Sequence, residues 1–453
     1  MSRESLINIA LTCGLSFIMM FIVGASVGFP GLLPILLNAS VYGDLCNITH
    51  DVNCSEIINT QLSMIASTTL TTLNAVGIIQ GLIIDIVGTR VLGIVGVVSW
   101  IGFTICSGLA PQKGWPFFLG FMGSSVSSTF IFFAIIADYG LGLSPANFPV
   151  LVPSLLTGFW DLGSFTDVLL RFVYFSVPNM ELYVLYTSYA CIIGIPSLIF
   201  LICCFPPEIS LSRNSFDWSQ IKTTIKDQFI DTLNMLKTRV FWGYVCACTS
   251  VVGYGYFIIP NIVPIMKWNG ADDKTAEHYN FVFAILLPSI GALGSIFCAF
   301  CVRFDRKITL CLVVIIQVIL ITGFIIITEI DGPLWIQYIG FILFVLWRMN
   351  GFVIINTLLP ITYEGSIGLN KAWGIIYTIS GVIGLVVDRI MTGLISQNLN
   401  SLLYINIGMY LFAAITSILF ALAFWFDLDD NCHVTGYIPK TAIIINEEQP
   451  LQV

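Results

Sequence analysis

The sequence has few charged residues: Asp, Glu, Lys and Arg make up 10% of its 453 residues, whereas hydrophobic residues make up 57%. Soluble domains carry about 25% charged residues. The chain therefore lacks the polar surface that a soluble multidomain protein needs. Its mean hydropathy of +0.93 instead indicates a polytopic membrane protein.

Histidine and nucleotide-binding motifs are also scarce. The three histidines, His50, His278 and His433, lie outside the predicted spans, so the sequence contains no intramembrane histidine relay and no evident zinc cluster. No G-x-x-x-x-G-K-[ST] motif is present, which argues against direct ATP hydrolysis. The net charge is −8 and no large basic patch occurs. We expect no metal, no cofactor, no nucleic-acid partner and no enzyme activity.

Long apolar runs recur along nearly the whole chain. A helix needs about 20 apolar residues to cross the hydrocarbon core, and each run is about that long. The first run continues past residue 30 without a clear cleavage site, so we expect a retained helix rather than a signal peptide. The predicted spans are 10–36, 61–84, 91–109, 116–138, 149–172, 183–204, 240–264, 279–301, 308–328, 334–358, 373–396 and 402–426.

The basic residues orient these spans. With the N-terminus inside, twelve of the 18 Lys and Arg residues fall in cytoplasmic segments, three fall outside and three lie within helices. This distribution follows the positive-inside rule. We therefore expect both termini in the cytoplasm and the loop after the first span outside.

That first loop carries glycosylation acceptors and cysteines. The stretch NASVYGDLCNITHDVNCSEI (38–57) contains three Asn-x-Ser/Thr triplets, which are used only on a lumenal or extracellular surface. Its two cysteines lie in an oxidising compartment in this orientation, so we predict a disulfide. Two free thiols with unused sequons are the alternative. The residues concerned are Asn38, Asn47, Asn53, Cys46 and Cys54.

Internal repeats divide the chain into two halves. FPGLLP (29–34) in the first span matches IPNIVP (259–264) in the seventh, and Asp85 matches Asp305 at a similar offset. The longest polar stretch between spans lies in the middle of the chain and predicts a connector with an amphipathic helix. The expected domains are an N-terminal six-helix bundle (1–205), the connector (206–239), a C-terminal six-helix bundle (240–427) and a cytoplasmic tail (428–453).

A glycine-rich motif lies between the second and third spans. GLIIDIVGTRVL (81–92) resembles the G-x-x-x-D-x-x-G-R-R signature of the major facilitator superfamily, and VRFDRK (302–307) is a degraded copy in the second half. Thr89 replaces the first arginine of that signature. A tight turn needs glycine, and its carboxylate can pair with arginine or cap a helix of the opposite half; an ordinary tight loop is the alternative. The predicted gating residues are Gly81, Asp85, Gly88, Arg90, Asp305 and Arg306.

A closer resemblance covers most of the chain. Three segments, VGFPGLLPILLNASVYGDLC (27–46), LLTGFWDLGSFTDVLLRFVYF (155–175) and the stretch 338–385, resemble solute carrier family 43 and the related apicomplexan amino acid transporters. The resemblance implies a twelve-helix major facilitator fold, an all-α membrane protein of two pseudo-symmetric six-helix bundles. It also implies facilitated transport of amino acids or nucleobases, without choosing between them.

Two charged residues near the middle of their spans are the strongest site candidates. An arginine such as Arg348 costs about 2.5–3.5 kcal/mol in mid-membrane, so it needs a cavity or a partner. It either clasps a substrate carboxylate or pairs structurally with Asp161. Asp161 has no basic residue three or four positions away and is a candidate for the substrate ammonium or a nucleobase N–H. The other predicted substrate-binding residues are Tyr254, Tyr256 and Asn350.

A second acid lies six residues further along the fifth span. Asp167 and Arg171 are four residues apart, a spacing at which helical side chains meet, and we expect them to pair.

The sequence thus predicts a monomeric plasma-membrane carrier of neutral or aromatic amino acids that works by alternating access within the lipid bilayer. A nucleobase carrier is the alternative in the same class. A receptor or scaffold that keeps the fold without transport is the alternative in another class.

Overall fold

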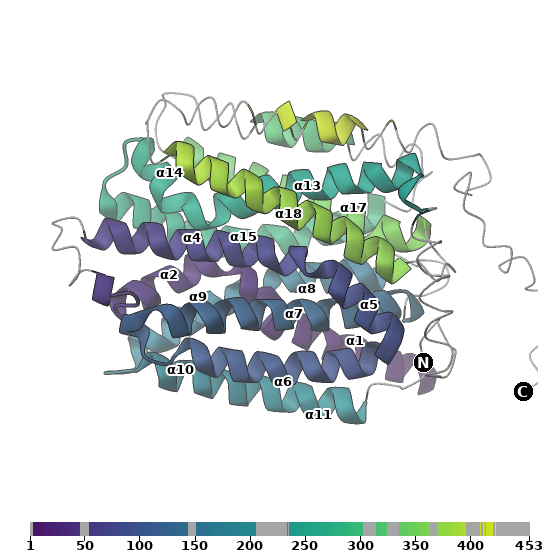
Figure 1. Ribbon diagram of the computed structural model, residues 1–453, viewed down its shortest axis with the longest axis horizontal. Helices are drawn as coiled ribbons and strands as arrows, with labels where there is room; N and C mark the ends of the chain where they lie inside the picture. The colour runs from purple at the N-terminus through teal and green to yellow at the C-terminus, as the bar shows by residue number, and fades with distance from the viewer. Residues whose placement is uncertain are drawn as a thin grey trace, which may run out of the picture.

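The computed structural model describes residues 3–45, 54–143, 151–204, 235–301, 314–323, 335–362 and 369–395, together with Leu233 and scattered positions between 408 and 422. All regular structure in these residues is helical, and they contain no strand. The helices run side by side along the longest axis of the molecule (Figure 1).

The N-terminal half is built from helices with short π and 3₁₀ segments between them. Its helices are α1 (Arg3–Ile18), α2 (Phe29–Asn38), α4 (Cys54–Ala75), α5 (Gly77–Val87), α6 (Thr89–Ser107), α7 (Trp115–Gly142), α8 (Leu151–Leu162), α9 (Phe165–Ser176), α10 (Leu182–Tyr189) and α11 (Ile195–Cys203). The short segments are η1 (Met19–Val23), η2 (Gly24–Val27), η3 (Pro111–Lys113) and η4 (Ala190–Gly194).

The C-terminal half follows the same plan. Its elements are α13 (Arg239–Ile258), η5 (Ile259–Asn261), α14 (Ile262–Trp268), α15 (Asp273–Cys301), α17 (Ile336–Thr362) and α18 (Leu369–Ile395). The predicted ninth span is described over Val314–Gly323, and the twelfth only at scattered positions. The predicted connector and its amphipathic helix lie almost wholly outside the described residues, as does the tail.

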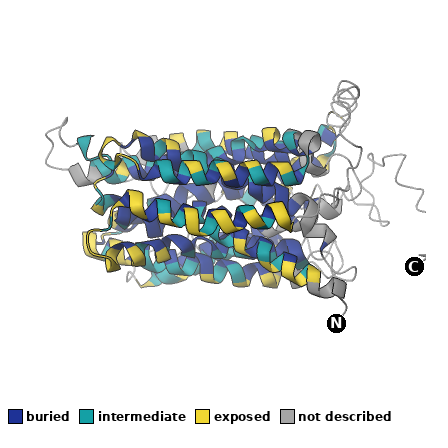
Figure 2. Cartoon of the chain, turned by 90° about the horizontal axis from the view of Figure 1, so that it is seen from below, coloured by how far each residue is buried: buried dark blue, intermediate teal, exposed yellow. Residues whose placement is uncertain are grey.

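Many of the helices are built to cross a membrane. Within the described residues, seven are long and apolar enough to do so. Large apolar side chains also lie exposed on the outside of the bundle, among them Phe172, Ile192 and Leu293, while buried residues fill the interior (Figure 2). An apolar exterior around a packed core suits lipid and not water. The chain is a multi-pass integral membrane protein.

Several of the predicted spans are interrupted, among them the first, the fifth and the seventh. The first changes from π to 3₁₀ to α-helix around Gly28, just before Pro30, and the seventh passes through a 3₁₀ turn that contains Pro260. Proline lacks the N–H that would continue the helical ladder, which explains both places. The fifth span, predicted as one helix, is divided between α8 and α9 by the turn at Gly163 and Ser164.

The contacts between the halves are symmetric. α18, the eleventh span, packs along α4 and α5, the second span, and α15, the eighth span, packs along α8, the fifth span. In a fold of two repeats of six spans, the second span corresponds to the eighth and the fifth to the eleventh. The contact of the second span with the eleventh therefore corresponds to the contact of the eighth with the fifth. The packing therefore has the pseudo-symmetry that the sequence repeats predict.

The halves touch near both ends of the second span. Ser63 Oγ donates to the carbonyl of Pro260 at 3.0 Å. At the other end, the backbone N–H of Ile78 donates to Thr378 Oγ1 at 2.7 Å, and a Cβ on Gly77 would lie 2.8 Å from the carbonyl oxygen of Gly374. These contacts are about 20 Å apart along the helix axis. Among the described residues, the two halves are therefore in contact near both ends of this span.

One prediction concerns the crossing of the first and fifth spans. A Cβ on Gly24 would lie 2.0 Å from the Trp160 carbonyl oxygen, and one on Gly163 would lie 2.2 Å from that of Met20. Because backbone atoms cannot move aside cheaply, we expect Gly24→Ala and Gly163→Ala to lower the unfolding free energy by about 1–3 kcal/mol. The control is Gly102→Ala on α6, where a Cβ has nothing within 4 Å.

The check is a melting curve of the detergent-solubilised protein, in which size-exclusion chromatography measures the folded fraction after heating to each temperature. Melting temperatures of Gly24→Ala and Gly163→Ala equal to that of the control would contradict the close crossing.

Candidate functional site

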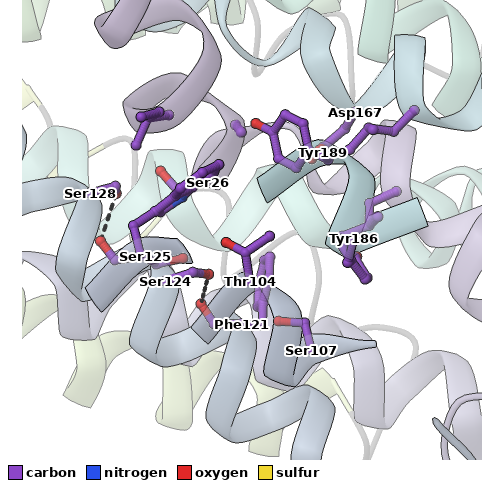
Figure 3. Close-up of a pocket in the computed structure, with 15 residues that line it drawn as sticks. Ser26, Thr104, Ser107, Phe121, Ser124, Ser125, Ser128, Asp167, Tyr186 and Tyr189 are labelled. Atoms are coloured by element: carbon purple, nitrogen blue, oxygen red, sulfur yellow. Dashed lines mark hydrogen bonds between the residues drawn. The ribbon is translucent and has the colours of Figure 1, made fainter. Parts of the chain in front are cut away.

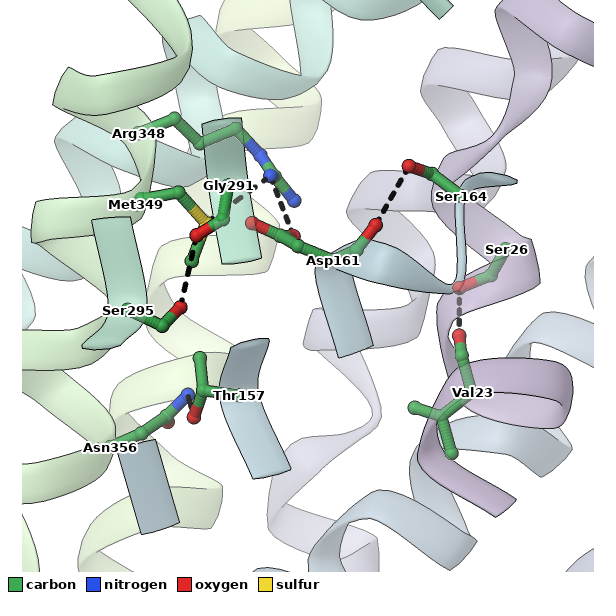
Figure 4. Close-up of polar contacts among 10 residues, drawn as sticks. All are labelled: Val23, Ser26, Thr157, Asp161, Ser164, Gly291, Ser295, Arg348, Met349 and Asn356. Atoms are coloured by element: carbon green, nitrogen blue, oxygen red, sulfur yellow. Dashed lines mark hydrogen bonds and ion pairs between the residues drawn. The ribbon is translucent and has the colours of Figure 1, made fainter. Parts of the chain in front are cut away.

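A buried ion pair joins the two halves. Arg348 Nη1, near the middle of α17, lies 2.8 Å from Asp161 Oδ1, near the end of α8 (Figure 4). The two side chains are 0% and 1% exposed. Each residue was a separate candidate in the sequence, with their pairing as one of two alternatives, and the structure brings them together.

Aromatic rings and glycines form the walls around this pair. The Arg348 guanidinium carbon lies 5.1 Å from the centroid of the Phe352 ring and 5.9 Å from that of Trp160, within the range of a cation–π interaction. A Cβ on Gly291 of α15 would lie 2.7 Å from Asp161 Oδ2. Gly255 of α13 likewise packs against the Arg348 side chain. Four helices, α8, α13, α15 and α17, therefore enclose the two charges.

The pair satisfies only part of the hydrogen-bonding capacity of its members. Asp161 Oδ2 and the Nε and Nη2 atoms of Arg348 are buried without a hydrogen-bond partner, as is Trp160 Nε1. The Tyr256 hydroxyl, which lies toward Asn74 and Arg348, also makes no hydrogen bond of ordinary geometry. An unmade buried hydrogen bond costs about 1–3 kcal/mol, and more for charged groups. The site thus retains free donors on a cation and a free acceptor on an anion.

A second polar contact crosses between the halves beside the ion pair. Asn356 Nδ2 of α17 donates to Thr157 Oγ1 of α8 at 3.4 Å, and the Tyr377 hydroxyl of α18 donates to Asn356 Oδ1 at 2.9 Å. Thr157 lies four residues before Asp161, and Asn356 lies eight residues after Arg348, so each shares a helix face with its charged neighbour. Sequence reasoning did not single out these three residues, although that spacing was the available signal.

The other predicted binding residues have mixed outcomes. The Tyr256 ring stacks on Phe352 at a centroid distance of 6.1 Å, so it belongs to the wall of the site. Tyr254 lies in α13, but its side chain is outside the described residues. Asn350 is buried in α17 two residues from Arg348 and therefore lies on a different face of the helix.

The predicted turn between the second and third spans is present. Gly88 has a φ of 82° and separates α5 from α6, which is the conformation that requires glycine. Gly81 is buried in α5. Arg90 donates to the carbonyl of Ile202 in its own half, not across the interface. The Asp85 side chain, Asp305 and Arg306 lie outside the described residues, so their gating role stays a prediction.

The first loop is described only at its edges. Asn38 is exposed at the end of α2, and its Oδ1 accepts a hydrogen bond from the Tyr174 hydroxyl at 3.3 Å. Asn47, Asn53 and Cys46 lie outside the described residues, and so does the side chain of Cys54. The disulfide and the glycosylation stay predictions.

The predicted pair between Asp167 and Arg171 does not form. Asp167 is 4% exposed, and its Oδ2 atom has no hydrogen-bond partner. Arg171 instead places its guanidinium carbon 4.8 Å from the centroid of the Phe281 ring. The two residues are four positions apart in α9, which permits a contact, but Arg171 packs on the Phe281 ring of α15 instead. In the described part of the chain, no cluster of three or more His, Cys, Asp or Glu residues suits a metal.

Comparison with known sequences finds one partial relative. Protein FMP42 of Saccharomyces cerevisiae (strain ATCC 204508 / S288c) is 30% identical over 161 residues, which is 34% of this chain and 31% of FMP42. The match spans about a third of that protein's length. No family model matches the chain.

Comparison with solved structures covers nearly the whole chain. FucP, the fucose–proton symporter of E. coli, matches with a TM-score of 0.61 and 15% identity over 94% of this chain and 99% of its own. FucP in the outward conformation gives a TM-score of 0.64 and 16% identity over the same shares. XylE, described as a proton–xylose symporter, gives a TM-score of 0.63 and 15% identity over 92% of this chain and 96% of its own. The chain has the fold of the major facilitator superfamily, as its sequence predicts.

Proposed function

We propose that the protein is a facilitative transporter of amino acids, neutral or aromatic ones, that works by alternating access. The supporting observation is the Arg348–Asp161 pair, which is buried between the halves and keeps unpaired atoms of both signs. A zwitterion supplies a carboxylate for the free edge of the guanidinium and an ammonium for the free carboxylate oxygen. It also brings no net charge into the site, which avoids the cost of an uncompensated buried ion.

The walls of the site favour an apolar or aromatic substrate side chain. Trp160, Phe352 and Tyr256 surround the pair with ring faces and edges, with Trp160 and Phe352 packed edge to face at 5.0 Å. Aromatic partners prefer such geometries, which add about 0.5–1.5 kcal/mol beyond burial. A second negative charge on the substrate would have no partner among these rings.

The contacts between halves suggest how the cycle runs. The halves touch at both ends of the second span, and the Arg348–Asp161 pair lies between those ends, so we assign this conformation to the occluded part of the cycle. Rocking the halves about the pair breaks one end contact at a time and exposes the pair to one side of the membrane. The bundle boundaries at residues 205 and 240, the plasma-membrane location and the cytoplasmic termini belong to this proposal and rest on the sequence.

The first prediction is uptake of neutral and aromatic amino acids from a labelled panel that also holds basic amino acids, adenine, guanine and hypoxanthine. We also test two modified amino acids as competitors: a methyl ester, which lacks the carboxylate, and an N-acetyl derivative, which lacks the ammonium. Each should compete at least about tenfold more weakly than the unmodified amino acid. Cells with matched surface levels of the protein are compared with untransfected cells. Uptake of nucleobases alone would overturn the amino acid assignment in favour of the alternative carrier.

The second prediction separates substrate binding from structure. Asp161→Asn alone leaves Arg348 charged and unpaired, so we expect it to destabilise the protein by about 3–5 kcal/mol. The double variant Asp161→Asn with Arg348→Gln removes both charges and should recover most of that stability, while uptake stays absent. Melting temperature and uptake are measured on the same preparations. Normal uptake by the double variant would make the pair purely structural.

The third prediction concerns the shape of the cation. Arg348→Lys keeps the charge but loses the planar fork that holds a carboxylate through two hydrogen bonds. We expect the KM for the amino acid to rise by about tenfold or more, with surface expression near normal. Saturation curves for wild type and Arg348→Lys check this, and an unchanged KM would argue against bidentate binding.

A further inference from the structure

A polar cavity lies within the N-terminal half, apart from the ion pair. It has a volume of about 40 Å³ and is surrounded by the first, third, fourth, fifth and sixth spans (Figure 3). Hydroxyl groups line much of it, among them those of Ser26, Thr104, Tyr186 and Tyr189. A water molecule needs about 10–15 Å³, so the space suits about three waters and is too small for an amino acid.

The cavity contains one carboxyl group. Asp167 of α9 is 4% exposed, and its Oδ2 atom has no hydrogen-bond partner. The Tyr186 hydroxyl and Thr104 Oγ1 in the same cavity are also unpartnered. Gly28 packs so closely that a Cβ there would lie 2.6 Å from Asp167 Oδ2. The acid is therefore held against the interruption of the first span.

No cation faces this acid in the described residues. From α10, the titratable groups that face it are Tyr186 and Tyr189. On its own helix, Arg171 turns to Phe281, in the field of Glu277 on α15. The residues that η1, η2, α2, α6 and α7 contribute to the cavity carry no charge. An isolated ionised carboxylate is costly to bury, and such a group normally takes up a proton instead.

Two of the spans around the cavity contain π-helical segments. The first span contains the π segment η1, and the sixth contains the π segment η4. The Tyr189 hydroxyl, next to η4, donates to the carbonyl of Phe21 inside η1. π segments are rare and frequent at functional sites. They therefore mark the same place independently of the acid.

We propose that Asp167 is a proton-binding site that couples substrate movement to the proton gradient. This rests on the proposed transport of amino acids and changes one part of it: the transport is coupled to protons, and is not the facilitated transport that the sequence resemblance implies. On the outer side the Asp167 carboxylate takes up one proton to become the neutral acid. On the cytoplasmic side it releases that proton and is again a carboxylate, so one proton crosses with one substrate.

The fifth span connects this site to the substrate site. Asp161 and Asp167 lie on either side of the turn at Gly163 and Ser164. Ser164 Oγ donates to the backbone carbonyl of Asp161 at 2.8 Å, and the N–H of Thr166 donates to that of Gly163 at 2.9 Å. A substrate that draws Asp161 away from Arg348 therefore moves the turn and the start of α9. That movement opens or closes the cavity around Asp167.

Transport by the purified protein in liposomes tests the proposal, with the amino acid that the panel identifies. With an inward gradient of about one pH unit and one proton per substrate, we expect wild type to accumulate the amino acid up to about tenfold. Asp167→Asn should equilibrate it without accumulation. Glu181→Gln, which changes an exposed acid at the start of α10, is the matched control and should behave as wild type. Equal accumulation by Asp167→Asn, or accumulation driven by a sodium gradient and not by protons, would overturn the proposal.

A second measurement needs no substrate. Infrared difference spectra between neutral and alkaline pH should show a protonated-carboxyl band in wild type and Glu181→Gln that Asp167→Asn lacks. If no compound on the panel is transported, the proposed function fails while this band still decides whether Asp167 holds a proton. A spectrum unchanged by Asp167→Asn would refute the proton site even if transport is observed.

Discussion

The burial of two opposite charges between the halves is the constraint on which the rest of the structure depends. Arg348 is expensive in mid-membrane, and Asp161 is expensive in any apolar interior, so each is tolerable only beside the other. Their 2.8 Å contact therefore fixes how α8 approaches α17. It also accounts for Gly291, because the Asp161 carboxylate occupies the space that a larger residue there would fill.

This pair breaks the symmetry of the fold. The packing of the second span on the eleventh and of the fifth on the eighth is related by a shift of six spans. At the offset of 220 that relates Asp85 to Asp305, however, Asp161 falls on Gly381. The repeat therefore explains how the helices pack, but the ion pair does not follow the repeat. A symmetric frame holding an asymmetric site suits a carrier whose ends alternate while its centre keeps a single binding geometry.

The sequence was enough to predict the fold: span lengths are a local signal of an all-α membrane protein, and the resemblance to known carriers implied the major facilitator arrangement. It also identified both members of the ion pair, since a mid-span charge requires a partner whatever the tertiary structure. It did not decide the pairing, because the two residues are 187 positions apart and belong to different halves. For Asp167 and Arg171 a local rule misled, since i,i+4 spacing permits a contact but does not oblige it when Phe281 lies nearby.

The interruption of the fifth span explains how one span serves two sites. Six residues turn an α-helix through about 600°, so even in a continuous helix Asp161 and Asp167 would point in directions about 120° apart. One therefore faces α17 and the other faces the cavity within its own half. The turn at Gly163 and Ser164 joins α8, which carries Asp161, to α9, which packs on α2, so a movement of Asp161 reaches the start of α9 through the hydrogen bonds of the turn. That division gives the span a joint where the charge at the interface and the acid in the cavity can influence each other.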